Sequence, residues 1–306
     1  MSATAQAVTG DEQGRAVVFH VDDVGMCHGA NMAFVELSRS GGVACGSVMV
    51  PCPWFPEIAS AAAAESTLDM GVHLTLTSEW PQYRWAPLTT HSRASGLIDD
   101  HGYFPRNCLA LRERLHVEAA EIELRAQVDR ALDAGIDVTH LDTHMGAALV
   151  PELVDVYVRL AMDYRLPVLL PRDAASYTGV LRMGEIPPGL HERHVERLES
   201  LGLPVFDHFR MTPEAYSPDV ETTYRRIIET VPPGVTFFAL HCNAPGDIEA
   251  IVPPRAHRRT QEYRLFGSGA PMRWAREQGI RPVAMREFRA LWRAALPASS
   301  IDTMNG

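Results

Sequence analysis

Short apolar segments alternate with longer amphipathic segments along most of the chain. The short segments are rich in β-branched residues, and they predict strands at 16–21, 43–50, 70–76, 137–142, 167–170, 203–208, 235–240 and 281–285. The longer segments, such as GANMAFVELSRS and VEAAEIELRAQVDRALDAG, repeat their apolar residues with the period of a helix. Strands that are apolar throughout and alternate with helices are typical of a parallel sheet that is buried on both faces.

Up to eight strand–helix units fit a closed barrel better than an open sheet. We therefore predict an α/β fold, a single-domain and irregular (β/α) barrel of the TIM-like type, over residues 16–295. Residues 1–15 and 296–306 lack this pattern and are expected to be disordered tails. The irregular stretch 77–108, rich in aromatic residues and proline, follows a strand and is a candidate substrate loop.

Composition and charge narrow the range of partners. The 306-residue chain has 38 acidic and 28 basic residues and a formal net charge of −10, which argues against the basic footprint of nucleic-acid binding. Five cysteines at irregular spacing do not predict a disulfide framework. The first residues lack the pattern of a signal peptide, and no apolar run reaches the ~20 residues of a membrane span. We therefore expect a cytoplasmic protein without nucleic-acid or membrane partners.

Chemically useful side chains stand at the ends of several predicted strands. They comprise two adjacent aspartates, a histidine in the third strand, a His/Asp/His cluster in THLDTH and a late histidine: Asp22, Asp23, His73, His140, Asp142, His144 and His241. The carboxyl ends of the strands in a parallel barrel meet at one rim, where the active sites of such folds lie. Because these residues are far apart in sequence, their coincidence at strand ends predicts a common site.

Histidine and aspartate together are typical ligands of divalent metal ions, and three protein ligands leave coordination positions for water and substrate. One aspartate and two histidines as ligands, a second aspartate as base and a distant histidine as acid make a complete set for hydrolysis. Taken singly, these residue types also fit structural roles, since adjacent aspartates often begin a turn or cap a helix.

Which side chains of THLDTH share a face depends on the local structure. A strand would point His140, Asp142 and His144 to one face, whereas a helix would bring only the two histidines together. The preceding AGIDV favours the strand. Only one or two of the three side chains would then reach a single ion, with the others supporting the ligands.

Four motifs resemble, in the same order, those of the YdjC-like carbohydrate deacetylases. The opening VVFHVDDVG resembles the family's ADDFG segment, MGVHLTL is similar to GxHxxLT, THLDTH is similar to THxDSHxH, and HRRTQEYRLF resembles a late helix of the family. The resemblance runs from about residue 16 to about residue 285. It implies a distorted (β/α) barrel, similar to that of the NodB-type deacetylases, which binds one divalent ion, commonly magnesium, and removes N-acetyl groups from sugars.

The resemblance also implies a role for each candidate residue. It makes Asp23, His73 and His144 the metal ligands, Asp22 the base and His241 the acid, with His140 and Asp142 as supporting residues. The implied ion is Mg²⁺, although one aspartate and two histidines also suit Zn²⁺. After His144 the chain reads MGAALVPE where the family often has further histidines, so the identity of the N-acetylated saccharide stays open.

Three functions compete at this point. The first is a metal-dependent hydrolase that removes an N-acetyl group from a carbohydrate. The second is a two-metal amidohydrolase or phosphoesterase, for which two ions per chain would be diagnostic. The third is a catalytically inactive sugar-binding barrel. The first is favoured because all the proposed functional positions are present. A homodimer is compatible with the sequence.

Overall fold

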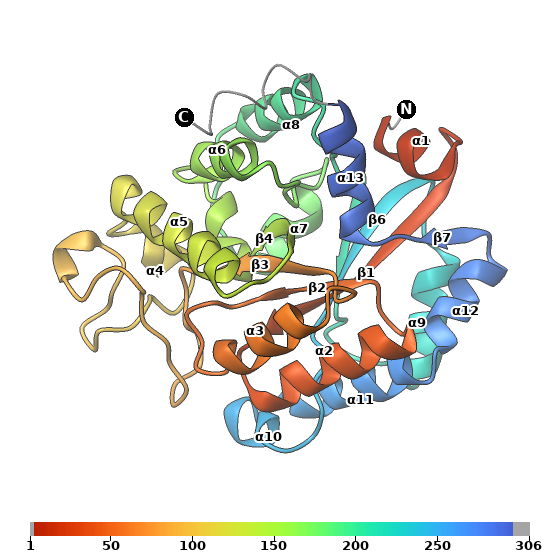
Figure 1. Ribbon diagram of the computed structural model, residues 1–306, viewed down its shortest axis with the longest axis horizontal. Helices are drawn as coiled ribbons and strands as arrows, with labels where there is room; N and C mark the ends of the chain where they lie inside the picture. The colour runs from red at the N-terminus through yellow and green to blue at the C-terminus, as the bar shows by residue number, and fades with distance from the viewer. Residues whose placement is uncertain (1–2, 296–306) are drawn as a thin grey trace.

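The strands form one parallel sheet at the centre of the molecule (Figure 1). The computed structural model describes residues 3–295, and the strands within them are β1 (Arg15–Val24), β2 (Cys45–Val48), β3 (Met70–Leu74), β4 (Val138–Thr143), β5 (His208–Met211), β6 (Gly234–Leu240) and β7 (Ile280–Pro282). Their order is β4-β3-β2-β1-β6-β5, with β7 beside the start of β1, and every pairing is parallel.

Two isolated bridges close this sheet into a barrel. Leu141 of β4 pairs with Val168, and Pro171 pairs with Phe206, which lies just before β5. The bridges therefore connect the two ends of the strand order through extended chain rather than through regular strands. The irregular (β/α) barrel predicted from the sequence is confirmed in this form.

For two of the eight predicted strands the prediction is wrong, because these segments do not form regular strands. The segments 167–170 and 203–208 form only the bridges, and β5 begins where the second of them ends. Prolines lie at positions 167, 171 and 204. Because proline has no N–H to donate, a regular ladder cannot extend through these segments.

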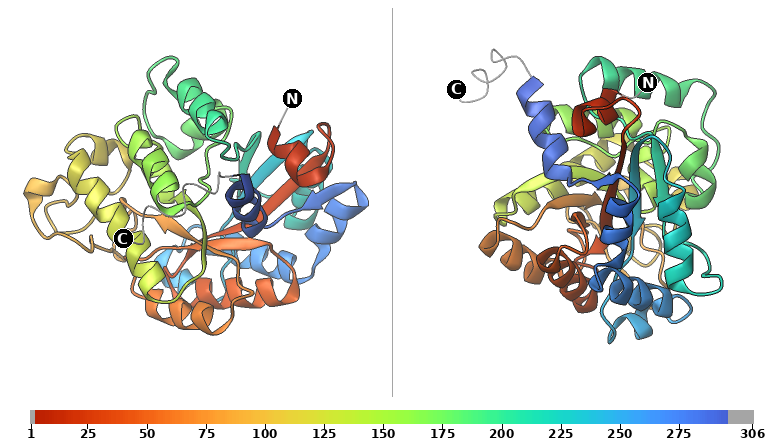
Figure 2. Two further views of the ribbon diagram at one scale, coloured as in Figure 1. Left: turned by 45° about the horizontal axis from the view of Figure 1, so that its top comes forward. Right: turned by 90° about the vertical axis from the view of Figure 1, so that its right-hand side faces the viewer.

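Helices surround the barrel on its outside (Figures 1 and 2). They are α1 (Ala3–Thr9), α2 (His28–Ser40), α3 (Phe55–Ala64), α4 (Cys108–Arg112), α5 (Val117–Asp133), α6 (Val154–Tyr164), α7 (Ala175–Leu181), α8 (Leu190–Ser200), α9 (Val220–Glu229), α10 (Ile248–Ile251), α11 (Ala256–Gly267), α12 (Ala270–Glu277) and α13 (Met285–Ala295). Two short 3-10 helices, η1 (Arg93–Ser95) and η2 (His144–Leu149), lie in the connections. No helix between residues 3 and 295 combines the length and apolar character needed to cross a membrane.

The expected disorder of residues 1–15 is wrong for the part that the structure describes. Residues 3–9 form α1, and 15 already belongs to β1. Ala5 and Val8 are buried and pack in one apolar cluster with Phe288 of α13. This burial gives the segment a tertiary partner that local sequence does not reveal. The predicted tail 296–306 lies outside the described residues.

The two faces of β1 pack against different surroundings. Val17, Phe19 and Val21 belong to the large cluster formed with the surrounding helices. Ala16 and Val18 belong instead to the smaller cluster that contains residues of α1 and α13. This smaller cluster lies at the start of β1, and we call it the lower end of the barrel. The upper end is the end at which the strands finish.

Candidate metal centre and active site

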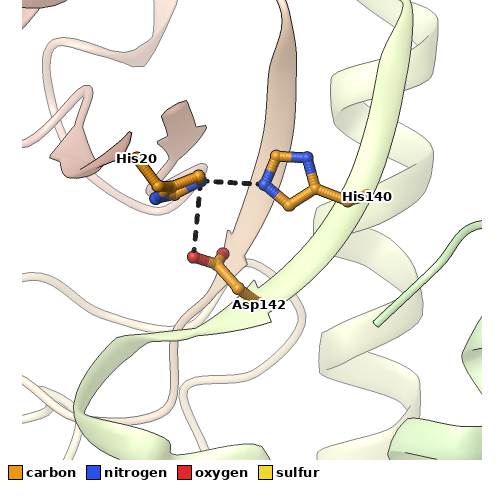
Figure 3. A group of neighbouring side chains, drawn as sticks. All are labelled: His20, His140 and Asp142. Atoms are coloured by element: carbon orange, nitrogen blue, oxygen red, sulfur yellow. Dashed lines mark hydrogen bonds and ion pairs between the residues drawn. The ribbon is translucent and has the colours of Figure 1, made fainter. Parts of the chain in front are cut away.

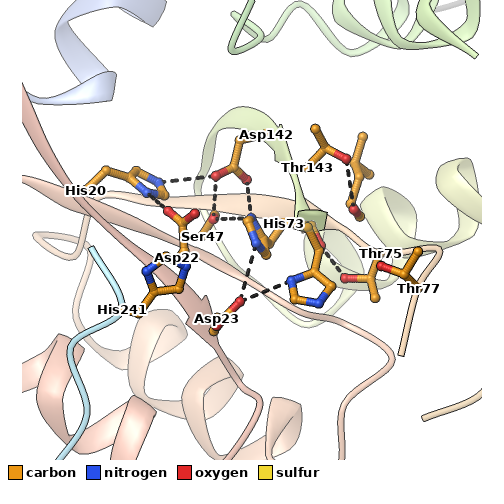
Figure 4. Close-up of polar contacts among 12 residues, drawn as sticks. His20, Asp22, Asp23, Ser47, His73, Thr75, Thr77, Asp142, Thr143 and His241 are labelled. Carbon is orange, nitrogen blue, oxygen red and sulfur yellow. Dashed lines mark hydrogen bonds and ion pairs between the residues drawn. The ribbon is translucent and has the colours of Figure 1, made fainter. Parts of the chain in front are cut away.

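Three residues from three strands meet around a common point at the upper end. Asp23 lies near the end of β1, His73 lies in β3, and His144 directly follows β4. Oδ1 of Asp23 is 3.5 Å from Nε2 of His73, and Figure 4 shows these two side chains facing each other. The same oxygen is 3.1 Å from Nδ1 of His144. All three side chains are buried, and one possible ligand atom from each lies within 4.8 Å of the other two. We call these three residues the Asp–His–His trio.

A distortion at the end of β1 separates the two adjacent aspartates. The pairing of β1 with β2 shifts register just before Val24. Asp23 has a φ of 63°, in the left-handed region that aspartate tolerates better than most residues. Gly25 follows with a φ of 86°, and a Cβ atom there would approach a neighbouring side chain to 2.9 Å. The chain therefore turns sharply here, and Asp22 and Asp23 contact different partners.

Each histidine of the trio is oriented by a second carboxylate. Nδ1 of His73 is 2.9 Å from Oδ1 of Asp142, and Nε2 of His144 is 2.9 Å from Oε2 of Glu79. When each carboxylate accepts an N–H, the opposite nitrogen of the ring keeps its lone pair on the side of Asp23. Such carboxylate–histidine pairs are typical of metal sites.

The donor set of the trio fits a divalent cation. One carboxylate and two imidazoles suit such an ion. Oδ2 of Asp23 is buried and accepts no hydrogen bond from residues 3–295, although it lies 2.8 Å from Nη1 of Arg259 in an ion pair. A second positive partner can therefore be accommodated at this carboxylate. The buried Asp and His residues could thus bind a metal ion.

Opposing effects act on the pKa values of the trio. Burial alone would raise the pKa of Asp23, but Arg259 and the hydrogen bonds from His144 and His73 bring it well below its ordinary value. Burial alone would lower the pKa of His144, but Glu79 and Asp23 raise it to about 9. A cation binds the deprotonated imidazole, so it must displace this proton, and its affinity falls as the pH is lowered.

Asp22 and His241 stand beside the trio on the wall of one cavity. The cavity has a volume of about 610 Å³, and the trio, Asp22 and His241 all line it. Oδ1 of Asp22 is 2.7 Å from Nδ1 of His20, and Nδ1 of His241 is 2.7 Å from Oγ1 of Thr212. Within the part of the chain that the structure describes, the other oxygen of Asp22 and Nε2 of His241 are therefore left for a bound substrate.

His241 follows β6 and is fixed from behind by a buried carboxyl group. Its backbone N–H donates to Oε2 of Glu262 at 2.9 Å. Burial raises the pKa of Glu262 to about 7. Burial and the nearby Arg259 lower the pKa of His241 to about 4, so its imidazole is neutral near pH 7.

The two predicted supporting residues differ in position. Asp142 contacts His73 directly and also accepts a hydrogen bond from the Ser47 hydroxyl at 2.9 Å. His140 is fully buried, and its ring nitrogens face other side chains than the trio. Its Nε2 lies 2.8 Å from Nε2 of His20, and its Nδ1 lies 2.9 Å from Oγ1 of Thr139. A role for His140 must therefore act through other side chains.

Three of the residues of this site that sequence reasoning missed show why it missed them. Glu79 lies in the irregular loop 77–108, where no periodicity assigns a direction to a side chain. Arg259 lies in HRRTQEYRLF, which resembles the family's late helix, but nothing in that motif indicates which arginine turns inward. His20 lies within the apolar run AVVFHV, and a single polar residue inside such a run is the one feature that marks it.

The fold and the site define a parallel (β/α)-barrel protein with a buried Asp–His–His centre at the carboxyl ends of its strands. The chain matches the model of the YdjC-like protein family over residues 16–277, and it belongs to this family. The resemblance inferred from the sequence motifs is therefore confirmed.

Curated relatives and one solved structure extend this assignment. The chain is 38% identical over 252 residues to a carbohydrate deacetylase of Thermus thermophilus, covering 82% of this chain and 86% of the relative. It is 33% identical to a carbohydrate deacetylase of Brevibacillus brevis, over 51% of this chain and 59% of that one. A crystal structure described as a candidate cellobiose-phosphate cleavage protein of Enterococcus faecalis superposes with a TM-score of 0.71 at 20% identity, over 89% of this chain and 98% of the other. This last match supports the fold alone.

Proposed function

We propose that this protein is a metal-dependent hydrolase that removes an N-acetyl group from a carbohydrate. The observation that carries the proposal is the Asp–His–His trio, with the carboxylate of Asp22 beside it on the same cavity wall. The relatives named carbohydrate deacetylase support the choice of an acetamide on a sugar as the substrate. The reaction is the hydrolysis of a linear amide C–N bond.

Asp23, His73 and His144 would hold one divalent ion. We propose Mg²⁺, with Zn²⁺ as the alternative because two of the three donors are imidazole nitrogens. When bound, such an ion supplies Lewis acidity, which lowers the pKa of water and polarises a carbonyl group. Asp142 and Glu79 keep the two histidine rings in the orientation and tautomer that this requires.

The proton transfers are assigned to Asp22 and His241. Asp22 removes a proton from the attacking water through the oxygen that His20 leaves free, while the water oxygen bonds to the acetyl carbon. His241 is neutral near pH 7, so it receives this proton from Asp22 before it protonates the departing amine nitrogen. Thr212 holds Nδ1 of His241, so Nε2 is the nitrogen that faces the substrate. The C–N bond breaks, and acetate and the free amine are the products.

The cavity has the size and lining of a small-molecule site. Aromatic side chains that line it include Trp80, Tyr177 and Phe209, and such rings are common in ligand pockets. Its volume of about 610 Å³ lies within the range typical of these pockets. We propose an N-acetylated amino sugar or a short chitooligosaccharide as its occupant.

Two substitutions at the adjacent aspartates test the assignment. Asp23→Ala is expected to lose both the bound ion and acetate release. Asp22→Asn is expected to keep the ion and to lower kcat about 100-fold or more, because general-base catalysis is removed. The measurements are metal content per chain and acetate release from N,N′-diacetylchitobiose. His28→Asn, at a half-exposed histidine close in sequence, serves as a control and should change neither. Equal loss of metal in both aspartate variants would contradict the division of roles.

A further inference from the structure

A column of buried polar side chains runs down the inside of the barrel from the cavity. Along β1, the inward positions change from Ala16 and Val18 in the apolar lower end to His20 and then to Asp22 at the cavity. His20 is fully buried and packs against the ring of Phe237, with 4.8 Å between the ring centroids. A fully buried histidine needs hydrogen-bond partners, because an unsatisfied polar group in such a place is costly.

Both ring nitrogens of His20 are engaged (Figures 3 and 4). Nδ1 lies 2.7 Å from Oδ1 of Asp22, and Nε2 lies 2.8 Å from Nε2 of His140. Nδ1 of His140 continues the chain to Oγ1 of Thr139 at 2.9 Å. The Thr139 hydroxyl in turn donates to the carboxylate of Asp69. The base of the proposed reaction is thus the first member of a continuous chain of buried hydrogen bonds.

The chain is made possible by a glycine on the neighbouring strand. A Cβ atom at Gly71 of β3 would lie 2.5 Å from Nε2 of His140. Any side chain at this position would therefore displace the His140 ring from His20. The lack of a side chain at Gly71 therefore leaves room for the His140 ring between β3 and β4.

The hydrogen bond to Asp22 has a fixed direction. A carboxylate oxygen only accepts, so the Nδ1–H of His20 donates to Oδ1 of Asp22. Further along the chain, burial holds the pKa of His140 well below its ordinary value, so this ring is neutral. At the far end the Thr139 hydroxyl donates to Asp69. The carboxylates of Asp22 and Asp142 flank the His20 ring, and Oδ2 of Asp142 lies 3.8 Å from Nε2 of His20.

The same three residues, His20, His140 and Asp142, lie close enough to resemble a second metal site. Their polar atoms are already satisfied by one another and by neighbours. Both oxygens of Asp142 are occupied, Oδ1 by His73 and Oδ2 by Ser47. Of the three, only Asp142 lines the cavity, whereas His20 and His140 are fully inaccessible to solvent. The geometry therefore favours a hydrogen-bonded chain over a second ion.

We propose that His20 is a positioning residue for the hydrolytic base: it holds one oxygen of Asp22, so that the other oxygen faces the substrate water. This inference rests on the role of Asp22 in the proposed function. Among residues 3–295, His20 does not line the cavity, and its ring nitrogens bond to Asp22 and His140 rather than to the trio. Its removal should therefore act on the chemical step and leave substrate binding and metal binding in place.

Two amide substitutions at position 20 separate this role from simple packing. The amide nitrogen of His20→Asn takes the place of Nδ1 and keeps a donor to Asp22. The amide of His20→Gln takes the place of Nε2, fills more of the space and faces His140 instead. We expect kcat to fall only a few-fold in His20→Asn and about 100-fold in His20→Gln, the loss typical of a misplaced reacting group. KM for N,N′-diacetylchitobiose and the metal content of one ion per chain should be unchanged in both.

The outcomes distinguish this inference from the proposed function. If wild-type protein releases acetate, Asp22→Asn abolishes the release, and His20→Asn is far more active than His20→Gln, the inference is supported. If the first two results hold but His20→Gln equals or exceeds His20→Asn, packing explains the residue and the inference is overturned. A second ion per chain that is lost in His140→Asn also overturns it. If wild type releases no acetate, the proposed function fails, and the inference fails with it.

A further variant covers the case in which His20→Gln does not fold. Thr139→Val is nearly isosteric and removes the hydroxyl at the far end of the chain, which contacts His140 and donates to Asp69. It should lower kcat about tenfold at unchanged KM, because the His20 ring loses its fixed partner. An unchanged kcat in this variant would overturn the inference.

Discussion

The two ends of the barrel are built on the same strands but differ in what holds them together. At the lower end, Ala16 and Val18 of β1 pack with Phe288 of α13 and with α1 in a cluster of buried hydrophobic residues. At the upper end, His20 and Asp22 of the same strand join a buried network of histidines and carboxylates. The change occurs within two residues along one inward face.

This contrast separates stability from chemistry. Apolar burial at the lower end stabilises the fold in proportion to the area removed from water. A buried polar network contributes little net stability and fails when one member is removed, because its partner is left unsatisfied. Substitutions at the lower end should therefore change the free energy of unfolding and leave metal binding and turnover intact, whereas those at the upper end should change metal binding and turnover.

The largest expected effect on stability is at Phe288, which is buried in the lower end and packs against Phe206 with ring centroids 5.3 Å apart. Phe288→Ala should lower the free energy of unfolding by about 3–5 kcal/mol, because it leaves a cavity. Chemical denaturation measures the loss. Phe288→Leu, as a matched control, should cost less. Folded Phe288→Ala should keep one ion per chain and a normal kcat, and a loss of metal binding would contradict the separation of the two ends.

The upper end has its own effect on stability, which depends on pH. Burial raises the pKa of Glu262 to about 7 from the usual 4.5, so the folded protein binds more protons than the unfolded chain between these values. Stability from this group is therefore fully present below pH 4.5 and is lost as the pH rises through 7, by about 3 kcal/mol in total. Glu262→Gln should remove this part of the pH dependence in denaturation curves measured from pH 5 to 8. Glu36→Gln, at a surface carboxylate, should leave it intact.

At the upper end, the sequence predicted which residues stand at the strand ends better than it predicted which side chains contact one another. Asp23 and His144 follow predicted strands, whose ends a parallel sheet brings together, and His73 stands in the motif MGVHLTL inside a third. Their roles stay predictions. His20 and Glu79 could not be found in this way, since one lies inside an apolar run and the other in a loop without periodicity. Their partners are 120 and 65 residues away, and only the folded barrel shows these contacts.

The two carboxylates behind the trio allow a finer comparison within the upper end. Asp142 is buried and orients His73, whereas Glu79 orients His144 and is partly exposed at the cavity. Asp142→Asn should weaken metal binding about 100-fold and Glu79→Gln about tenfold, within the range typical of residues that orient metal ligands. Titration calorimetry with Mg²⁺ and Zn²⁺ measures both affinities. An unchanged affinity in Asp142→Asn would contradict the assignment of His73 as a ligand.

The smallest expected effect concerns α1, the segment for which the sequence predicted disorder. Local pattern fails here because seven residues are too few for a stable isolated helix, so tertiary contact must hold the helix in place. Val8 is 4% exposed and packs in the lower end, whereas Gln6 on the same helix is exposed. Val8→Ala should therefore lower the free energy of unfolding by about 1–2 kcal/mol, and Gln6→Ala should leave it nearly unchanged. If both substitutions were neutral in denaturation experiments, α1 would not contribute to the lower end in solution, and the barrel would be closed there by α13 and the strands alone.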